Sequence, residues 1–284
     1  MKFTNSAKLK AAIKKLANES KVPAQGILQK YVMERFLCRL SQSRYKKNFV
    51  LKGGFLTSSL VGVAKRTTMD IDATAIGLAV EIETLEKIIQ VICSVKTSDG
   101  FEFQLSKIEF IRELDSYPGF RIYLKASYGT LTIPFYMDIT TGDAMTPGPV
   151  EQIFWSMFDE GDFELLAYNA ETLLSEKLET ILSRGVLNTR PRDFYDVDLL
   201  WNKYKKTIKT KILSNAIQNT MLHRHTENLL KKSLEIVNSI KVDENMINRW
   251  KKYQKENSFV GEREFSKVCE SIFEIMKVIN LEMQ

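Results

Sequence analysis

Histidine and cysteine are scarce in this chain of 284 residues, which contains two histidines and three cysteines. With so few histidines, no Ser/His/Asp or Cys/His arrangement for nucleophilic catalysis can be recognised. Cys38, Cys93 and Cys269 are odd in number and widely spaced, so they form neither a metal-ligand pair nor a disulfide framework. The sequence therefore argues against histidine- or cysteine-based catalysis.

Long apolar runs are missing as well. No uninterrupted apolar stretch approaches the roughly 18 residues that a membrane helix needs. The lysine-rich stretch 1–20 lacks the apolar core of a signal peptide. Hydrophobic residues make up 44% of the chain and charged residues 27%, which is the balance of an ordinary globular protein. We therefore expect a cytoplasmic protein with no membrane partner.

Positive charge is concentrated in one region of the chain. The whole sequence has 41 Lys and Arg against 35 Asp and Glu, a net charge of +6. The stretch 203–255 alone contains 13 basic and four acidic residues, a local balance of +9. Clustered cations of this kind neutralise phosphates and release counterions. Two interpretations stay open, namely an anionic partner such as RNA and a set of lysine-rich, solvated helix faces.

Hydrophobic periodicity divides the chain into helical and strand-rich parts. Short apolar or alternating runs predict strands at 49–51, 69–73, 101–105, 108–114, 120–128 and 131–139, with a hairpin turn at 129–130. Helical spacing predicts helices at 5–19, 24–42, 55–63, 80–95, 170–184, 191–204, 207–220, 227–240, 243–257 and 263–281. Pro134 requires an edge position, a bulge or a local break in its strand.

The predicted fold class is therefore α+β. We expect a helical N-terminal lead over 1–45, a core with a mixed β-sheet over 46–168, and an all-helical C-terminal domain over 169–284.

An acidic strand carries the most informative chemistry. Asp70 and Asp72 are two residues apart on a predicted strand, so both side chains project from the same face. Hard cations such as Mg²⁺ bind carboxylates together with substrate phosphate oxygens. Asp138, at the end of another apolar strand, is the candidate for a third carboxylate. The other possibilities are pairing of the first two acids with Arg66 or Lys65, and a strand-end cap for Asp138.

A glycine-rich turn precedes this strand. Gly53 and Gly54 follow the short strand 49–51, and without side chains they allow the backbone to approach a phosphate closely. Thr57 is among the hydroxyl residues near the turn. A strand, a glycine turn, a helix and a strand with Asp-x-Asp, in this order, are the layout expected of a nucleotidyltransferase core.

The same motifs resemble a known family. The resemblance covers residues 48 to 201 and rests on three groups of residues: Lys52-Gly53-Gly54 with Arg66, Thr68, Asp70 and Asp72; Asp138-Ile139 with Gly142-Asp143; and Leu174, Glu176-Lys177-Leu178, Arg184, Arg192-Asp193, Tyr195-Asp196. In these residues the chain resembles the AbiEii-type nucleotidyltransferase toxins. This family of abortive-infection (phage-defence) and type IV toxin–antitoxin systems includes the MenT toxins.

The resemblance implies roles for individual residues. It implies catalytic roles for Asp70, Asp72, Lys177 and Asp196, with Lys177 contacting the phosphates. Asp193 is the alternative to Asp196 as the acid of the C-terminal motif, and a structural salt bridge is as compatible with its spacing. The implied substrate-binding residues are Lys52, Gly53, Gly54, Thr57, Arg66 and Thr68, and the implied metal ligands are Asp70, Asp72 and Asp138 for Mg²⁺.

The resemblance also implies a function. Such an enzyme would transfer an NMP from an NTP to an RNA acceptor, with tRNA as the expected RNA, and so block translation and growth. A cognate antitoxin protein would neutralise it. Two alternatives stay open: transfer to a hydroxyl of a protein or small molecule, and a degenerate core that serves as a non-catalytic binding module.

Overall fold

The computed structural model describes residues 3–111, 119–158 and 161–282, and it divides the chain into two compact units. The first unit comprises Met1–Gly142 and Val150–Ala167, and the second comprises Asp143–Pro149 and Tyr168–Gln284. The two helices at the N-terminus thus belong to the same unit as the sheet. The short segment before Val150 belongs to the helical unit, because Asn169 donates hydrogen bonds to the carbonyls of Thr146 and Gly148.

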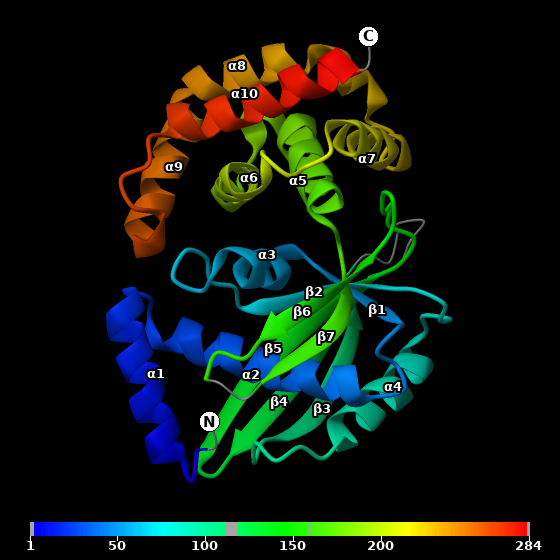
Figure 1. Cartoon of the computed structure of the whole chain (residues 1–284), viewed down its shortest axis with the longest axis vertical. Helices are drawn as coiled ribbons and strands as arrows, with labels where there is room; N and C mark the ends of the chain where they lie inside the picture. Colours follow the sequence, from blue (N-terminus) through cyan, green and yellow to red (C-terminus); the bar gives the residue numbers. More distant parts are fainter. Residues whose placement is uncertain (1–2, 112–118, 159–160, 283–284) are drawn as a thin grey trace. The chain divides into compact units, whose positions relative to one another are not determined.

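A seven-stranded mixed sheet forms the centre of the first unit (Figure 1). Its strands are β1 (Phe49–Lys52), β2 (Asp70–Ala75), β3 (Glu102–Phe110), β4 (Phe120–Tyr128), β5 (Leu131–Thr140), β6 (Val150–Trp155) and β7 (Asp162–Ala167), in the order β3-β4-β5-β2-β1-β7-β6. Strand β2 pairs parallel with β5 and antiparallel with β1, and β1 pairs parallel with β7. The predicted mixed α+β fold is confirmed.

Two parts of the sheet differ from the sequence expectation. The two strands predicted between 101 and 114 are one strand, β3, with a register irregularity between Leu105 and Lys107. Residues 112–114 of that prediction lie outside the described residues. Strands β6 and β7 form an additional antiparallel hairpin that the periodicity did not indicate. Alternation is weak in β6 because Val150, Ile153 and Trp155 are all exposed.

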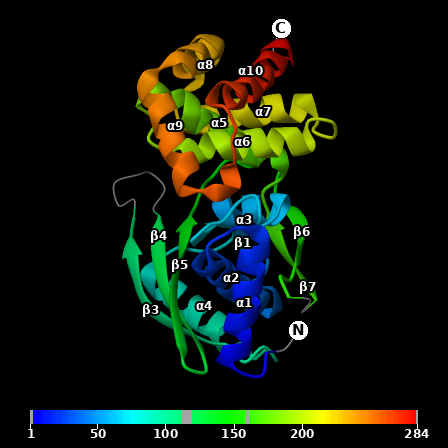
Figure 2. The same cartoon turned by 90° about the vertical axis from the view of Figure 1, so that its left-hand side faces the viewer.

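Helices cover the apolar face of this sheet. The helices of the unit are α1 (Ser6–Ser20), α2 (Ala24–Gln42), α3 (Gly53–Val61) and α4 (Ile82–Ser94). Helix α2 packs on β5 and β7, α4 packs on β3 and α2, and α1 packs on α2, as Figure 2 shows from the side. Rings of Phe36, Phe103 and Phe135 meet at centroid distances of 5.5–5.8 Å between α2, β3 and β5. The core therefore lies between α2 and one face of the sheet.

Pro134 lies inside β5, which has a neighbouring strand on each side. The pairing with β2, however, begins only at Tyr136, so Pro134 lies where β5 has β4 as its sole sheet neighbour. The missing N–H therefore removes no hydrogen bond to β2. The carbonyl of Pro134 accepts a hydrogen bond from the Gln29 side chain of α2. The expected edge position is realised locally, within a strand that is central elsewhere.

The second unit is helical, as its composition indicates. Its helices are α5 (Ala170–Arg184), α6 (Pro191–Tyr204), α7 (Thr210–His223), α8 (Ser233–Val242), α9 (Glu244–Glu256) and α10 (Phe265–Glu282), with short 3₁₀ turns at Gly185–Leu187, Glu227–Lys232 and Ser258–Val260. Asn169 caps α5 by accepting from the Thr172 amide, and α6 begins with Pro191, where a proline suits the first turn. Tyr195, Trp250 and Phe265 form the aromatic centre that joins α6, α9 and α10. Throughout the described residues, the helices are too short or too polar to span a lipid bilayer.

Candidate active site

Three aspartates lie on one face of the central sheet. Asp70 and Asp72 alternate along β2 with the buried Ile71 and Ala73, so their carboxylates point away from the helix-covered core. On the neighbouring parallel strand β5, Asp138 is the direct partner of Asp72. Partners in register on adjacent strands project from the same face. The tertiary structure thus places the three predicted carboxylates side by side.

The Gly53-Gly54 turn lies directly against Asp72. Gly53 has a φ of +62°, and a Cβ at this position would lie 2.0 Å from the carboxylate Oδ2 of Asp72. The amide of Gly54 donates a hydrogen bond of 3.2 Å to the same oxygen. The Asp72 carboxylate therefore interacts with the N-terminus of α3, where the backbone amides favour negative charge. Gly53 is therefore needed for the approach of the Asp72 carboxylate, and Gly54 is needed for the approach of the Thr68 hydroxyl, which would lie 2.5 Å from a Cβ there.

Replacing Gly53 with alanine is expected to displace Asp72. The left-handed backbone alone costs an alanine about 1–2 kcal/mol, and the new methyl group must push the carboxylate away from Gly54. We expect a loss of thermal stability and a loss of nucleotidyl transfer together. The matched control is Gly148→Ala, because a Cβ at Gly148 meets nothing within 4 Å. Wild-type activity and melting temperature in Gly53→Ala would contradict the assigned turn geometry.

Burial and nearby negative charge both raise the pKa of Asp72. Burial is the largest cause that raises the pKa of Asp72, and together with the nearby Asp70 carboxylate it brings the value to about 6. Asp138 adds in the same direction, whereas the positive charge of Lys52 opposes the shift. Lys52 itself is buried and donates a hydrogen bond of 2.7 Å to Thr140 at the end of β5. The positive charge of Lys52 and the Gly54 amide therefore offset only part of the rise in the pKa of Asp72.

Arg121, which the sequence analysis did not identify, belongs to this cluster. Its guanidinium donates two hydrogen bonds of 2.7 Å to the two oxygens of Asp138, and this pairing raises the pKa of Arg121. The guanidinium also lies 4.2 Å from the ring centroid of Tyr136. The hairpin turn at 129–130 could have revealed this pair, because a two-residue turn sets the register and places Arg121 opposite Asp138.

The remaining predicted residues of the first unit support the turn and the strand. Thr68 donates a hydrogen bond of 2.5 Å to the carboxylate of Asp70. Thr57 is fully buried and donates to the Gly53 carbonyl, so it stabilises the turn from inside. Arg66 is buried, and its carbonyl accepts from Ser58.

A buried lysine of α2 completes this support and was also missed. The ammonium of Lys30 donates a hydrogen bond of 2.7 Å to Ser58, which in turn donates to the Arg66 carbonyl. Burial lowers the pKa of Lys30 to about 8, against the opposing effect of the Glu34 carboxylate. Lys30 therefore anchors the loop that leads from α3 into β2. No periodic signal distinguishes it from the exposed lysines of other helices.

The carboxylates of the first unit can provide two ligands for a divalent cation. Asp70 and Asp72 are paired carboxylates on one face of β2, and a pair of carboxylates suits a hard cation. Asp138 is engaged by Arg121. Within the described ranges, no three Asp, Glu, His or Cys side chains are already arranged as a metal-binding group. Two carboxylates are sufficient for Mg²⁺ when phosphate oxygens and water complete the coordination.

The C-terminal motif forms a separate cluster inside the second unit. The ammonium of Lys177 on α5 donates a hydrogen bond of 2.7 Å to Asp196 on α6, and it lies 3.6 Å from Asp193. Asp196 is completely buried, whereas Asp193 also pairs with Arg190 at its own helix start. The structure thus brings together Lys177 and both acids of the motif. Asp196 is the acid that holds the lysine.

Comparisons with known proteins agree with this architecture. Two crystal structures from Helicobacter pylori have a similar fold: a protein described as a candidate nucleotidyltransferase, with a TM-score of 0.54, and JHP933, with a TM-score of 0.53. Each is 13% identical to this chain and covers 91% of it, and the alignments cover 96% and 93% of the two relatives. A search of curated proteins returned no significant match.

A family model gives the assignment directly. The model of the nucleotidyl transferase AbiEii toxins of type IV toxin–antitoxin systems matches residues 35–270, which include both the aspartate strands and the Lys177 motif. This match covers most of the chain. The chain belongs to the AbiEii family and is a nucleotidyltransferase toxin of the type IV toxin–antitoxin class.

Proposed function

We propose that this nucleotidyltransferase transfers an NMP from an NTP to an RNA acceptor, with tRNA as the RNA, and thereby blocks translation and growth. The observation that carries the proposal is the register of β2 and β5, which aligns Asp72 with Asp138 and leaves Asp70 on the same face. In the reaction, an acceptor hydroxyl gives its proton to solvent water, and its oxygen bonds to the α-phosphorus of the NTP. The bond from that phosphorus to the bridging oxygen breaks, and pyrophosphate leaves.

The residues of the first unit would bind Mg²⁺ and the NTP. Asp70 and Asp72 would hold the cation, with Asp138 as a further ligand if Arg121 releases it. When bound, the cation neutralises phosphate charge and lowers the pKa of an attacking hydroxyl. Lys52 supplies a positive charge at the same sheet edge, since its ammonium already lies against Thr140. Amides at the start of α3 add donors for an anion.

Lys177 and Asp196 are proposed to act as a pair. Lys177 would contact a substrate phosphate, as in the family motif. Asp196 is completely buried, so it is a positioning residue that orients the Lys177 ammonium through their 2.7 Å hydrogen bond. Asp193 shares this task at longer range and links the lysine to Arg190.

The family assignment also bears on the biological setting. Type IV toxin–antitoxin membership supports a cognate antitoxin as the neutralising partner. Because NTPs and tRNA are the proposed substrates, we place the activity in the cytoplasm.

The direct test is a transfer assay with purified protein, Mg²⁺, total tRNA and each labelled NTP in turn. We expect label in the RNA fraction with the wild type and none with Asp72→Ala. Parallel reactions with total protein in place of RNA identify the acceptor class. Label in protein but not in RNA would overturn the RNA acceptor while leaving the reaction type intact. Transfer that persists in Asp72→Ala would overturn the assignment of the site.

A further inference from the structure

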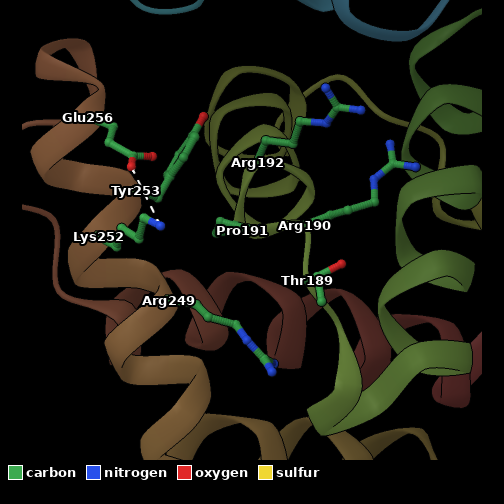
Figure 3. Close-up of a pocket in the computed structure, with 8 residues that line it drawn as sticks. All are labelled: Thr189, Arg190, Pro191, Arg192, Arg249, Lys252, Tyr253 and Glu256. Atoms are coloured by element: carbon green, nitrogen blue, oxygen red, sulfur yellow. Dashed lines mark ion pairs between the residues drawn. The ribbon is translucent and has the colours of Figure 1, made fainter.

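A cationic pocket lies within the second unit, next to the Lys177 cluster, to which Arg190 is joined through Asp193. It has a volume of about 470 Å³ and is lined by Thr189, Arg190, Pro191, Arg192, Arg249, Lys252, Tyr253 and Glu256. The lining residues come from α9, from the first turn of α6 and from the two residues that precede α6, as Figure 3 shows. Four cations and one acid therefore surround one hollow. The size suits a ligand of about one nucleotide, at the lower end of ordinary ligand sites.

Two of the arginines are held in place by the protein. Arg249 donates hydrogen bonds of 3.0 Å to the carbonyls of Val186 and Asn188, which joins α9 to the turn before α6. The Nε of Arg190 lies 2.8 Å from the carboxylate of Asp193. Fixed arginines lose little conformational entropy when they bind a phosphate. These contacts thus give the pocket a preorganised cationic wall.

The other two cations extend into solvent at the pocket rim. Arg192 is exposed, and among the described residues it has no hydrogen bond or ion pair. Lys252 is exposed and is 3.9 Å from Glu256, a weak surface pair drawn as a dashed line in Figure 3. Arg190 is neutralised by Asp193, whereas Arg192 and Lys252 carry positive charge that a bound anion can neutralise. Glu256 is therefore the single acid in the pocket lining against the two rim cations.

An aromatic ring completes the pocket. Tyr253 is half-buried and lies beside the cationic side chains, with its body packed near Tyr195 and Trp250 (Figure 3). A tyrosine with its ring anchored in this way can stack on a base while arginines bind the adjoining phosphates. A simple anion would bind to the cations and make no use of the Tyr253 ring. A nucleotide within a strand can place its phosphate on the cations and its base on the ring.

We propose that this pocket binds one nucleotide of a single-stranded segment of the acceptor RNA, with phosphates at Arg192 and Lys252 and the base on Tyr253. This inference rests on the proposed RNA acceptor and adds the site at which the strand is bound. It also selects between the two interpretations of the basic stretch 203–255. On this proposal, the pocket contributes more to RNA affinity than the positive charge spread over the helices of 203–255 does.

The test measures binding of a fluorescein-labelled single-stranded RNA to the full-length protein by anisotropy over a range of salt concentrations. The double variant Arg192→Gln/Lys252→Gln is expected to weaken binding at least about tenfold and to reduce the salt slope by about 1.4, since single strands lose about 0.7 per phosphate contact. Tyr253→Leu should weaken binding about tenfold with an unchanged salt slope. The control Lys211→Gln/Lys255→Gln removes the same charge from exposed positions outside the pocket.

Equal losses in the pocket and control double variants would overturn the proposal, because diffuse charge would then explain binding. Binding of labelled polyglutamate is measured in parallel as a probe for an acidic protein partner. Pocket variants that lose affinity for polyglutamate but keep their affinity for RNA would overturn the proposal in favour of such a partner. In the transfer assay, the pocket variants should raise KM for RNA with kcat retained. RNA binding through the pocket without any transfer would support the pocket and refute the proposed acceptor. If the pocket variants still transfer label and bind RNA as tightly as the wild type, the proposed RNA site in the pocket is refuted, while the proposed RNA acceptor stands.

Discussion

Replacing Asp72 with asparagine is expected to reduce nucleotidyl transfer about 10³-fold, because several kcal/mol of transition-state stabilisation depend on the charge at this position. The asparagine keeps the volume of the side chain, and its carbonyl oxygen can still accept from Gly54. Since burial and Asp70 raise the pKa of Asp72 to about 6, the folded protein disfavours its charged form. The variant should therefore melt at or above the wild-type temperature while its activity disappears.

The matched control for this prediction is Asp162→Asn. Asp162 is an exposed acid on β7 of the same sheet, so its replacement removes one negative charge without touching the cluster. Initial rates with labelled NTP, together with melting curves for both variants, make the comparison. Transfer above about a tenth of the wild-type rate in Asp72→Asn would contradict a direct role. A large drop in melting temperature would instead indicate a structural role.

Replacing Asp196 with alanine is expected to lower the free energy of unfolding by about 3–5 kcal/mol. The side chain is completely buried, and its loss leaves the Lys177 ammonium inside the helical unit with Asp193 at 3.6 Å as the remaining acid. Urea titration followed by tryptophan fluorescence measures the effect. Trp201 and Trp250 are buried in this unit, whereas Trp155 of the other unit is 76% exposed and changes little.

Two further variants show whether the loss of stability in Asp196→Ala comes from the buried ion pair or from any change of charge in the second unit. Glu235→Ala removes an exposed acid on α8 and should change stability by less than about 0.5 kcal/mol. The double variant Lys177→Met/Asp196→Leu removes both charges and should recover much of the lost stability. It should remain inactive, because the proposed phosphate contact is gone. A single-variant loss below about 1 kcal/mol would contradict the buried pair.

Local order in the protein could be predicted well from the sequence. Helical periodicity located both N-terminal helices and the helical second unit, and the glycine turn at residue 129 defined the β4–β5 hairpin. Alternation along β2 placed Asp70 and Asp72 on one face without any knowledge of neighbours. These features depend on side-chain periodicity and turn geometry, which involve residues that are close together in the chain.

Spatial neighbourhood was decided by the tertiary structure. The pairing of Asp72 with Asp138 depends on β5 lying parallel to β2, and periodicity does not encode strand order. Periodicity also does not indicate where the β6–β7 hairpin joins the sheet, which it does through the parallel pairing of β7 with β1 at Leu51. The 2.7 Å contact between Lys177 and Asp196 depends on how two helices pack. The sequence alone indicated Asp70, Asp72 and Asp138 as candidate site residues, and it determined that the first two share a strand face, because side-chain alternation along one strand is local. Their partners, Gly54 for Asp72 and Arg121 for Asp138, were decided only when long-range pairing brought distant segments within hydrogen-bond reach.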